Sequence, residues 1–152
     1  MKQLDELIYD AICADDDLMD AIGGRVESTC FEVSPEEQDN TPVPYLIVTD
    51  DGFQNNLGTK DTIWEGDEDA VRATVEVAGN DPAEVKKLTK MVRRAVENHI
   101  VSLCNDGEDT PQLDSLQSQG IAWDWMKPCY YQHLMYNCTV NSTVIAEDES
   151  ED

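Results

Sequence analysis

The first 24 residues predict two helices. Apolar side chains recur every three or four positions near the start of the chain, and the residues between them are mostly polar; the apolar set is Leu4, Leu7, Ile8, Ala11 and Ile12. This spacing places them on one face of an amphipathic helix. A shorter second helix is expected to follow, because an aspartate within 15–17 can cap its start and Gly23–Gly24 can end it.

The middle of the chain predicts strands. Residues 25–33 can hold a short strand, and the prolines and turn formers of 34–44 predict a loop. An apolar strand is expected over 45–51. Residues 53–69 combine turn formers with a brief Thr-Ile-Trp stretch, as in a hairpin arm. Residues 70–79 alternate with a period of two, apolar at odd positions and polar at most even ones, which predicts a half-buried strand.

The pattern over 82–104 predicts a long helix. Asn80 or Asp81 can cap it, Pro82 fits its first turn, and Glu84 lies near the positive end of the helix dipole. One face carries an apolar stripe, which consists of Val85, Leu88, Met91, Val92, Ala95, Val96, His99, Ile100 and Leu103. Charged residues occupy the opposite face.

The last third predicts a loop, two strands and a tail. Residues 105–120 are polar and turn-rich, so a mobile loop insertion is expected there. Residues 121–127 and 129–146 are rich in aromatic and β-branched residues, and Pro128 separates the two predicted strands. Residues 147–152 form an acidic tail. The element order predicts a single α+β domain over 1–146, with two main helices packed on a mainly antiparallel sheet.

Charge narrows the range of functions. The chain has 33 acidic and 10 basic residues and a formal net charge of −23. Such a surface disfavours binding to nucleic acid or an anionic membrane, because both need cations to neutralise phosphate groups. Two explanations for the acidity stay open: a protein of a high-salt cytoplasm, or a surface that must repel DNA. No secretion signal or membrane-spanning run is recognisable, so a soluble protein made in a cytoplasm is expected.

Candidate chemistry is sparse. Neither phosphate-binding loops nor a nucleophile elbow occur in the sequence. His99 falls on the apolar helix stripe, where a packed or interface histidine is expected. His133 lies among aromatic residues without visible partner spacing, so no catalytic role is expected for it. Loops starting at Asp51 and Asn105 invite comparison with calcium loops, but they place Phe53 and Gly107 where a ligand is required. We therefore predict no catalytic residue, no cofactor and no metal site, with weak ion binding by acidic loops left open.

The five cysteines are odd in number and form no CxxC pair. A disulfide framework is therefore not indicated, and reduced, mostly buried thiols are expected.

Half of the positive charge lies in one short segment. Five of the ten basic residues fall within nine positions, and these are Lys86, Lys87, Lys90, Arg93 and Arg94. They can be a solvated helix face, a nucleic-acid contact, or a surface that docks on the acidic flank of another copy. In a chain this acidic, the last interpretation makes the five residues a candidate subunit interface.

The order of these motifs resembles that of the tail-terminator proteins of long-tailed bacteriophages and archaeal viruses, which complete the tail and join it to the head. The similar features over about residues 1–100 are an amphipathic first helix, a short second helix ending in IGGRV (22–26), and three further segments: PVPYLIV (42–48), RATVEVAG (72–79) and DPAEVKKLTKMVRRAV (81–96). The 105–120 segment and the acidic tail depart from the family's pattern.

This resemblance implies a non-enzymatic virion protein at the head–tail junction. It would form a homo-oligomeric ring, typically a hexamer, that sits on the tail-tube protein, ends tube polymerisation and joins a neck or head-completion protein. DNA would pass through the lumen without specific binding. The alternative is an acidic cytoplasmic adaptor or nucleic-acid mimic without enzymatic activity. A metal-dependent hydrolase is a third hypothesis, which no motif favours.

Overall fold

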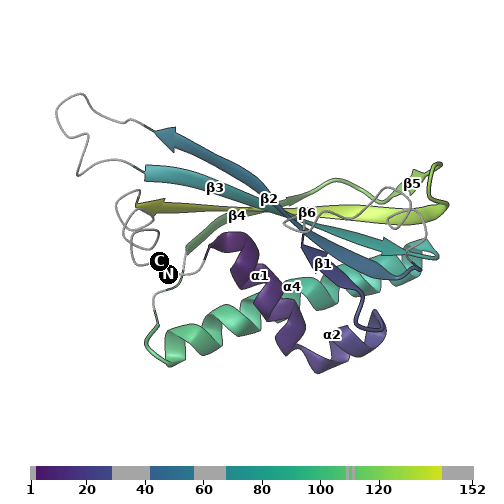
Figure 1. Cartoon of the computed structure of the whole chain (residues 1–152), viewed down its shortest axis with the longest axis horizontal. Coiled ribbons are helices and arrows are strands. Elements are labelled where there is room, and N and C mark those ends of the chain that lie inside the picture. Colours follow the sequence, from purple (N-terminus) through teal and green to yellow (C-terminus); the bar gives the residue numbers. More distant parts are fainter. Residues whose placement is uncertain (1–2, 29–41, 57–67, 109, 111, 142–152) are drawn as a thin grey trace.

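The computed structural model describes residues 3–28, 42–56, 68–108, 110 and 112–141, and these residues form two layers (Figure 1). One layer is a six-stranded sheet, and the helices cover one of its sides. The helices are α1 (Leu4–Ala14), α2 (Asp16–Ala21) and α4 (Pro82–Asn105). The strands are β1 (Val26–Ser28), β2 (Tyr45–Asn56), β3 (Glu68–Gly79), β4 (Gln112–Ser118), β5 (Ala122–Asp124) and β6 (Cys129–Asn141).

The sheet is mixed but mostly antiparallel. Its strand order is β1-β2-β3-β6-β4, and β5 pairs with the first residues of β6. Only the β1–β2 pair is parallel among the described strands, with Val26 opposite Leu46. The predicted α+β class, with two main helices on a mainly antiparallel sheet, is confirmed.

The helix boundaries follow from local capping. The Glu84 backbone N–H donates to the Asp81 carboxylate at 2.8 Å, and the Glu84 carboxylate accepts from the Asn80 N–H at 2.8 Å. This reciprocal pair satisfies backbone donors that a helix start leaves without partners. Asp15 caps α2 in the same way, accepting from the Leu18 N–H at 2.9 Å. The two glycines after α2 have φ values of +61° and +74°, which ends that helix.

The core lies between the sheet and the helices. Ala73, Val75 and Val77 point from β3 toward the helices, as the alternating pattern predicted. The apolar faces of α1 and α4 pack against these strand residues. The central stripe of each helix is buried: Leu4, Ile8, Ala11 and Ile12 on α1, and Val85, Leu88, Val92, Ala95 and Val96 on α4. Each fully buried aliphatic side chain contributes about 1.5–3 kcal/mol to folding.

Strand β2 is longer than predicted. The sequence indicated a strand over 45–51, whereas the strand continues to Asn56. Gly52, with a φ of +84°, lies in a register shift between Asp50 and Phe53, and pairing with β3 resumes beyond it. A bulge of this kind interrupts the alternating pattern without ending the strand. Most of the expected hairpin arm, residues 57–67, lies outside the described residues.

The prediction of a loop over 105–120 was wrong, because this segment contains the strand β4. Leu113 and Leu116 pack against the core and pair with Cys138 and Tyr136 of β6. A register shift between Leu113 and Ser115 separates the two leucines by three residues instead of two. The sequence therefore shows no clear alternation, although an edge strand with one apolar face needs only a few buried residues.

The strand predicted over 121–127 is also shorter in the structure. β5 ends at Asp124, whose carboxylate accepts hydrogen bonds from the Met126 and Lys127 N–H groups at 3.0 and 3.3 Å. These bonds favour a turn over a continued strand. The following strand is described up to Asn141, so its expected end at 146 lies outside the described residues. None of the described helices is both long and apolar enough to cross a lipid bilayer.

Candidate assembly surface

The five clustered cations lie on the solvent side of α4, where all of them are exposed. We call this set the basic ridge: Lys86, Lys87, Lys90, Arg93 and Arg94. Within it, Lys86, Lys90 and Arg93 are spaced i, i+4 and i+7, so they form one row along the helix. Lys87 and Arg94 form a second row further around the same face.

The basic ridge is not neutralised within the described part of the chain. None of its five side chains forms an ion pair or a side-chain hydrogen bond with another described residue. Helix-surface cations are commonly paired with an acid three or four residues away. Here Glu97 lies four residues after Arg93 on an exposed face, yet the two do not form such a pair. Within the described residues, the five cations therefore have no charged partner.

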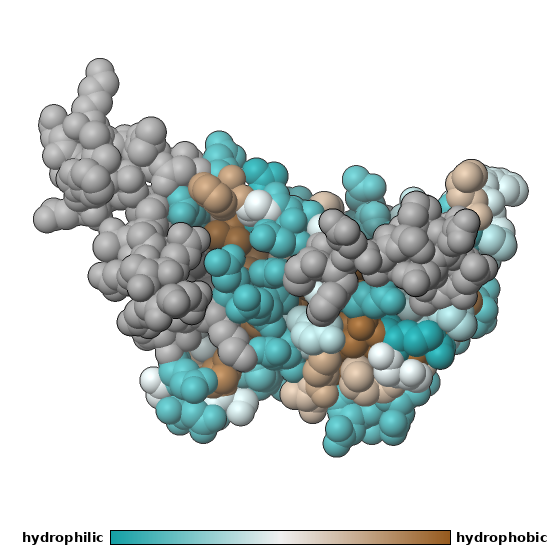
Figure 2. Space-filling model, viewed as in Figure 1, coloured by the Kyte–Doolittle hydropathy of each residue, from teal (hydrophilic) through white to brown (hydrophobic). Residues whose placement is uncertain are grey.

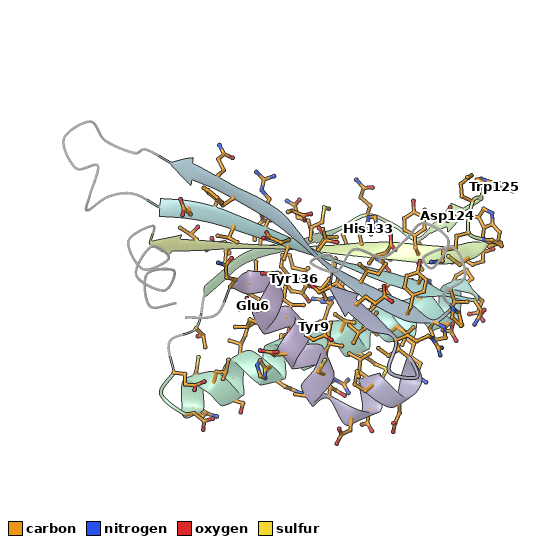
Figure 3. All side chains as sticks on the ribbon, viewed as in Figure 1. Glu6, Tyr9, Asp124, Trp125, His133 and Tyr136 are labelled. Carbon is orange, nitrogen blue, oxygen red and sulfur yellow. The ribbon has the colours of Figure 1, made fainter. Side chains whose placement is uncertain are left out.

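Aromatic residues project from the end of the sheet next to the start of α4. The Trp123 ring stacks edge-on against Trp125 and Tyr130, with ring centroids 6.0 and 4.7 Å apart. Trp125 is 86% exposed and Met126 is 89% exposed. Figure 3 shows Trp125 pointing away from the sheet beyond Asp124. We call Trp123, Trp125, Met126 and Tyr130 the aromatic corner.

The aromatic corner interrupts a mostly hydrophilic surface. On the face that Figure 2 shows, most described residues are hydrophilic, and hydrophobic residues show in separate areas. Exposed tryptophans in such a setting are typical of protein–protein contacts, because a large rigid ring buries much area with little loss of entropy.

A groove joins the basic ridge to the aromatic corner. It has a volume of about 550 Å³, and it is lined by Pro82, Lys86, Gly120, Ile121, Ala122, Trp123, Tyr130 and Gln132. Thr89 donates a hydrogen bond to Gln132 at 3.2 Å and so ties α4 to β6 beside the groove. This combination was not predictable from the sequence. Trp123 and Trp125 are expected there to alternate along a strand, and they lie more than 35 positions after Lys86 in the chain.

Further along the row, Arg93 lies near Tyr136, whose side chain points toward the helices (Figure 3). The Tyr136 hydroxyl is buried and has no hydrogen-bond partner among the described residues. Burial raises the pKa of Tyr136, and the charge of Arg93 partly opposes this change. The phenol is therefore neutral, and it belongs to the core rather than to a reactive site.

The sheet face that the helices leave open carries a second groove, of about 560 Å³. His133 lies on this face (Figure 3), and its Nε2 is 3.0 Å from the Glu76 carboxylate. Tyr45 donates a hydrogen bond to the same carboxylate at 3.4 Å, and the Lys127 ammonium lies 4.3 Å from the centroid of the Tyr45 ring. Burial and the nearby Glu76 charge raise the pKa of Tyr45.

These contacts give His133 a structural role. Cys129 lies on the same strand as His133, but burial raises the pKa of its thiol, so the thiol is protonated and weakly reactive at neutral pH. His99, predicted on the apolar stripe, is half-buried and lines a third groove with Asp15, Asp16 and Asp17. Neither histidine is placed beside an activated nucleophile within the described residues.

The described part of the chain offers no ready metal centre. Nowhere in it do three or more histidine, cysteine, aspartate or glutamate side chains converge in a way that could hold an ion. The described cysteines are free thiols: Cys129 and Cys138 are buried, and Cys13 and Cys104 are exposed. Burial raises the pKa of Cys138 to about 11. The expected reduced state thus agrees with these four residues, but only two of them are buried.

Comparisons with known proteins give a similarity in fold. No family model matches the sequence, and no curated protein matches it. Among solved structures, the fold is similar to a chain of the virion of the native gene transfer agent (GTA) particle, with a TM-score of 0.46 and 13% sequence identity. The match covers 91% of this chain and 95% of that chain.

Proposed function

We propose that this chain is a structural virion protein that forms a ring at the head–tail junction. In this role it caps the tail tube, ends tube polymerisation and provides the surface that joins the neck or head. The observation that carries the proposal is the basic ridge, which is exposed and unpaired within the described residues of a chain with a net charge of −23. Such a surface suits docking on an acidic copy of the same chain.

The placement of opposite charges supports a head-to-tail contact. Asp15, Asp16 and Asp17 lie against the side of α4 that carries Ala95 and His99. On the helical wheel that side is about half a turn from Lys90. The two charged surfaces therefore face different directions, and a contact between them joins unlike surfaces of two copies. A contact of this type generates a closed ring when the rotation between copies closes.

The order of elements also supports the proposal. The helix–helix–strand–strand–helix order on which the resemblance to tail terminators rests is the order of α1, α2, β2, β3 and α4. An acidic ring suits the passage of DNA, because negative charge on the lumen repels the phosphate backbone instead of retaining it.

The test is the mass of the protein in solution, measured by analytical ultracentrifugation from about 0.1 to about 3 M KCl, where charge screening varies widely. We expect hexamers, alone or on the ends of purified tail tubes. Charge reversal by Lys90→Glu or Arg93→Glu should weaken assembly by about tenfold or more, because each change replaces an attraction with a repulsion.

The matched control is Arg72→Glu, which reverses an exposed cation on the open sheet face, away from the basic ridge. Equal effects of Arg72→Glu and Lys90→Glu would contradict the assigned interface. A chain that stays monomeric at every salt concentration and on tube ends, yet binds a cationic protein, would favour the adaptor or nucleic-acid mimic instead.

A further inference from the structure

The groove between the basic ridge and the aromatic corner has a basic end and an aromatic end. One end is lined by Trp123 and Tyr130, and the exposed Trp125 packs edge-on against Trp123. The other end is lined by Lys86, the first residue of the row Lys86, Lys90 and Arg93. The complementary segment is apolar at one end and acidic at the other. Carboxylates on the row gain charge-assisted contacts, and apolar side chains bury area against tryptophan.

The chain itself contains such a segment. Residues 144–146 read Val-Ile-Ala, and residues 147–152 read Glu-Asp-Glu-Ser-Glu-Asp, with five carboxylates in six positions. The row from Lys86 to Arg93 spans seven helical steps, or about 10 Å, which two to four extended residues can follow. The apolar residues come first in this segment and match the aromatic corner, and the acidic residues that follow match the row from Lys86 to Arg93.

We propose that residues 144–152 of one copy dock in this groove on a second copy, with Val144–Ala146 on the aromatic corner and the acidic residues along Lys86, Lys90 and Arg93. This inference rests on the proposed ring, since it names one contact between neighbouring copies. Lys87 and Arg94, in the second row, remain available to Asp15, Asp16 and Asp17 of a neighbouring copy.

The contact must be between two copies, because too few residues separate β6 from Val144 for the segment to reach the groove of its own copy. Tyr130, in the aromatic corner, and Asn141 lie at opposite ends of β6, eleven residues apart. At a strand rise of about 3.3 Å per residue they are separated by about 36 Å. Val144 follows Asn141 by three residues and can move only about 11 Å away from it. It therefore cannot reach the aromatic corner of its own copy.

The first experiment measures binding of the segment by fluorescence anisotropy, using a labelled synthetic peptide of residues 142–152. The protein is the full chain in which the five carboxylates of 147–152 are replaced by amides, so that its own tail does not compete. We expect saturable binding that weakens with salt. Lys86→Glu or Trp125→Ala should reduce the affinity by about tenfold or more, and Arg72→Glu should not.

A peptide with all five carboxylates amidated serves as the matched ligand control, and it should bind at least about tenfold more weakly. Circular dichroism verifies that Trp125→Ala and Lys86→Glu remain folded, as expected for exposed side chains. Absent binding, or equal binding to folded Lys86→Glu and Arg72→Glu proteins, would overturn the inference.

The second experiment mixes two defective full-length proteins. One carries Lys86→Glu and keeps an acidic tail; the other carries the amidated tail and keeps an intact groove. If the contact is between copies, the intact tail of one protein can bind the intact groove of the other. The mixture should then assemble more readily than either protein does alone. Unchanged rings of the amidated-tail protein would overturn this inference and leave the ring proposal standing. Peptide binding without any ring would contradict the ring and leave the groove assignment standing.

Discussion

Asp5 is an acidic residue that is partly buried beside a second carboxylate, that of Asp50. It lies on α1, and both partial burial and the nearby carboxylate of Asp50 raise its pKa. A carboxyl group whose pKa is higher in the folded state binds more protons there than in the unfolded chain. Stability therefore falls as the pH rises from the unfolded value, about 3.9, through the folded value.

Asp5→Asn should accordingly raise the melting temperature at pH 7, and the gain should shrink as the pH is lowered toward 4. Thermal unfolding followed by circular dichroism at several pH values measures this. Glu6→Gln is the matched control, because Glu6 is exposed in the same first turn of α1 and loses the same charge. A gain of equal size for Glu6→Gln would show that net charge, rather than the setting of Asp5, is responsible.

Residue chemistry was only partly predictable. The exposure of the five basic residues follows from their place opposite the apolar stripe of one helix. The pair formed by His133 and Glu76 could not be predicted, because these residues are brought together by the register of β3 and β6. Trp125 was assigned to a strand, and a hydrogen-bonded turn at Asp124 leaves it exposed instead.

At the scale of elements, the stability of α4 depends on the N-cap residue Asp81. The Asp81 carboxylate accepts from the Glu84 N–H, so Asp81→Ala removes this cap. We expect a loss of about 1 kcal/mol in the free energy of unfolding, measured by urea denaturation. Asp81→Asn keeps a side-chain acceptor and should retain most of the stability. Equal losses for both substitutions would show that the charge near the helix dipole matters more than the hydrogen bond.

The predictability of an element depended on how regularly its apolar residues repeat. α4 was predicted to within a residue, because its apolar stripe continues for about five turns without interruption. β4 was missed and β2 was predicted too short, because a register shift breaks the alternation in each. A bulge is stabilised by pairing with the neighbouring strand, and that pairing is not visible in a local pattern.

At the scale of the molecule, the net charge of −23 should make stability depend strongly on salt. Repulsion among like charges destabilises the compact state, and added ions screen it. We expect the melting temperature to rise by several degrees between about 0.1 and about 1 M salt. Parallel series in KCl and NaCl separate screening from a specific sodium site, since screening alone gives equal curves. A flat or falling curve would contradict repulsion as the dominant effect.

The sequence by itself determined the α+β class, the two main helices, the half-buried strand β3 and the placement of five cations on one exposed helix face. Each of these depends on the spacing of residues within one segment, which local geometry converts directly into a face. Only the tertiary structure decided the strand order, the edge strand β4 and the groove that joins Lys86 to Trp123. These features depend on packing between segments far apart in the chain, where long-range contacts override local preference.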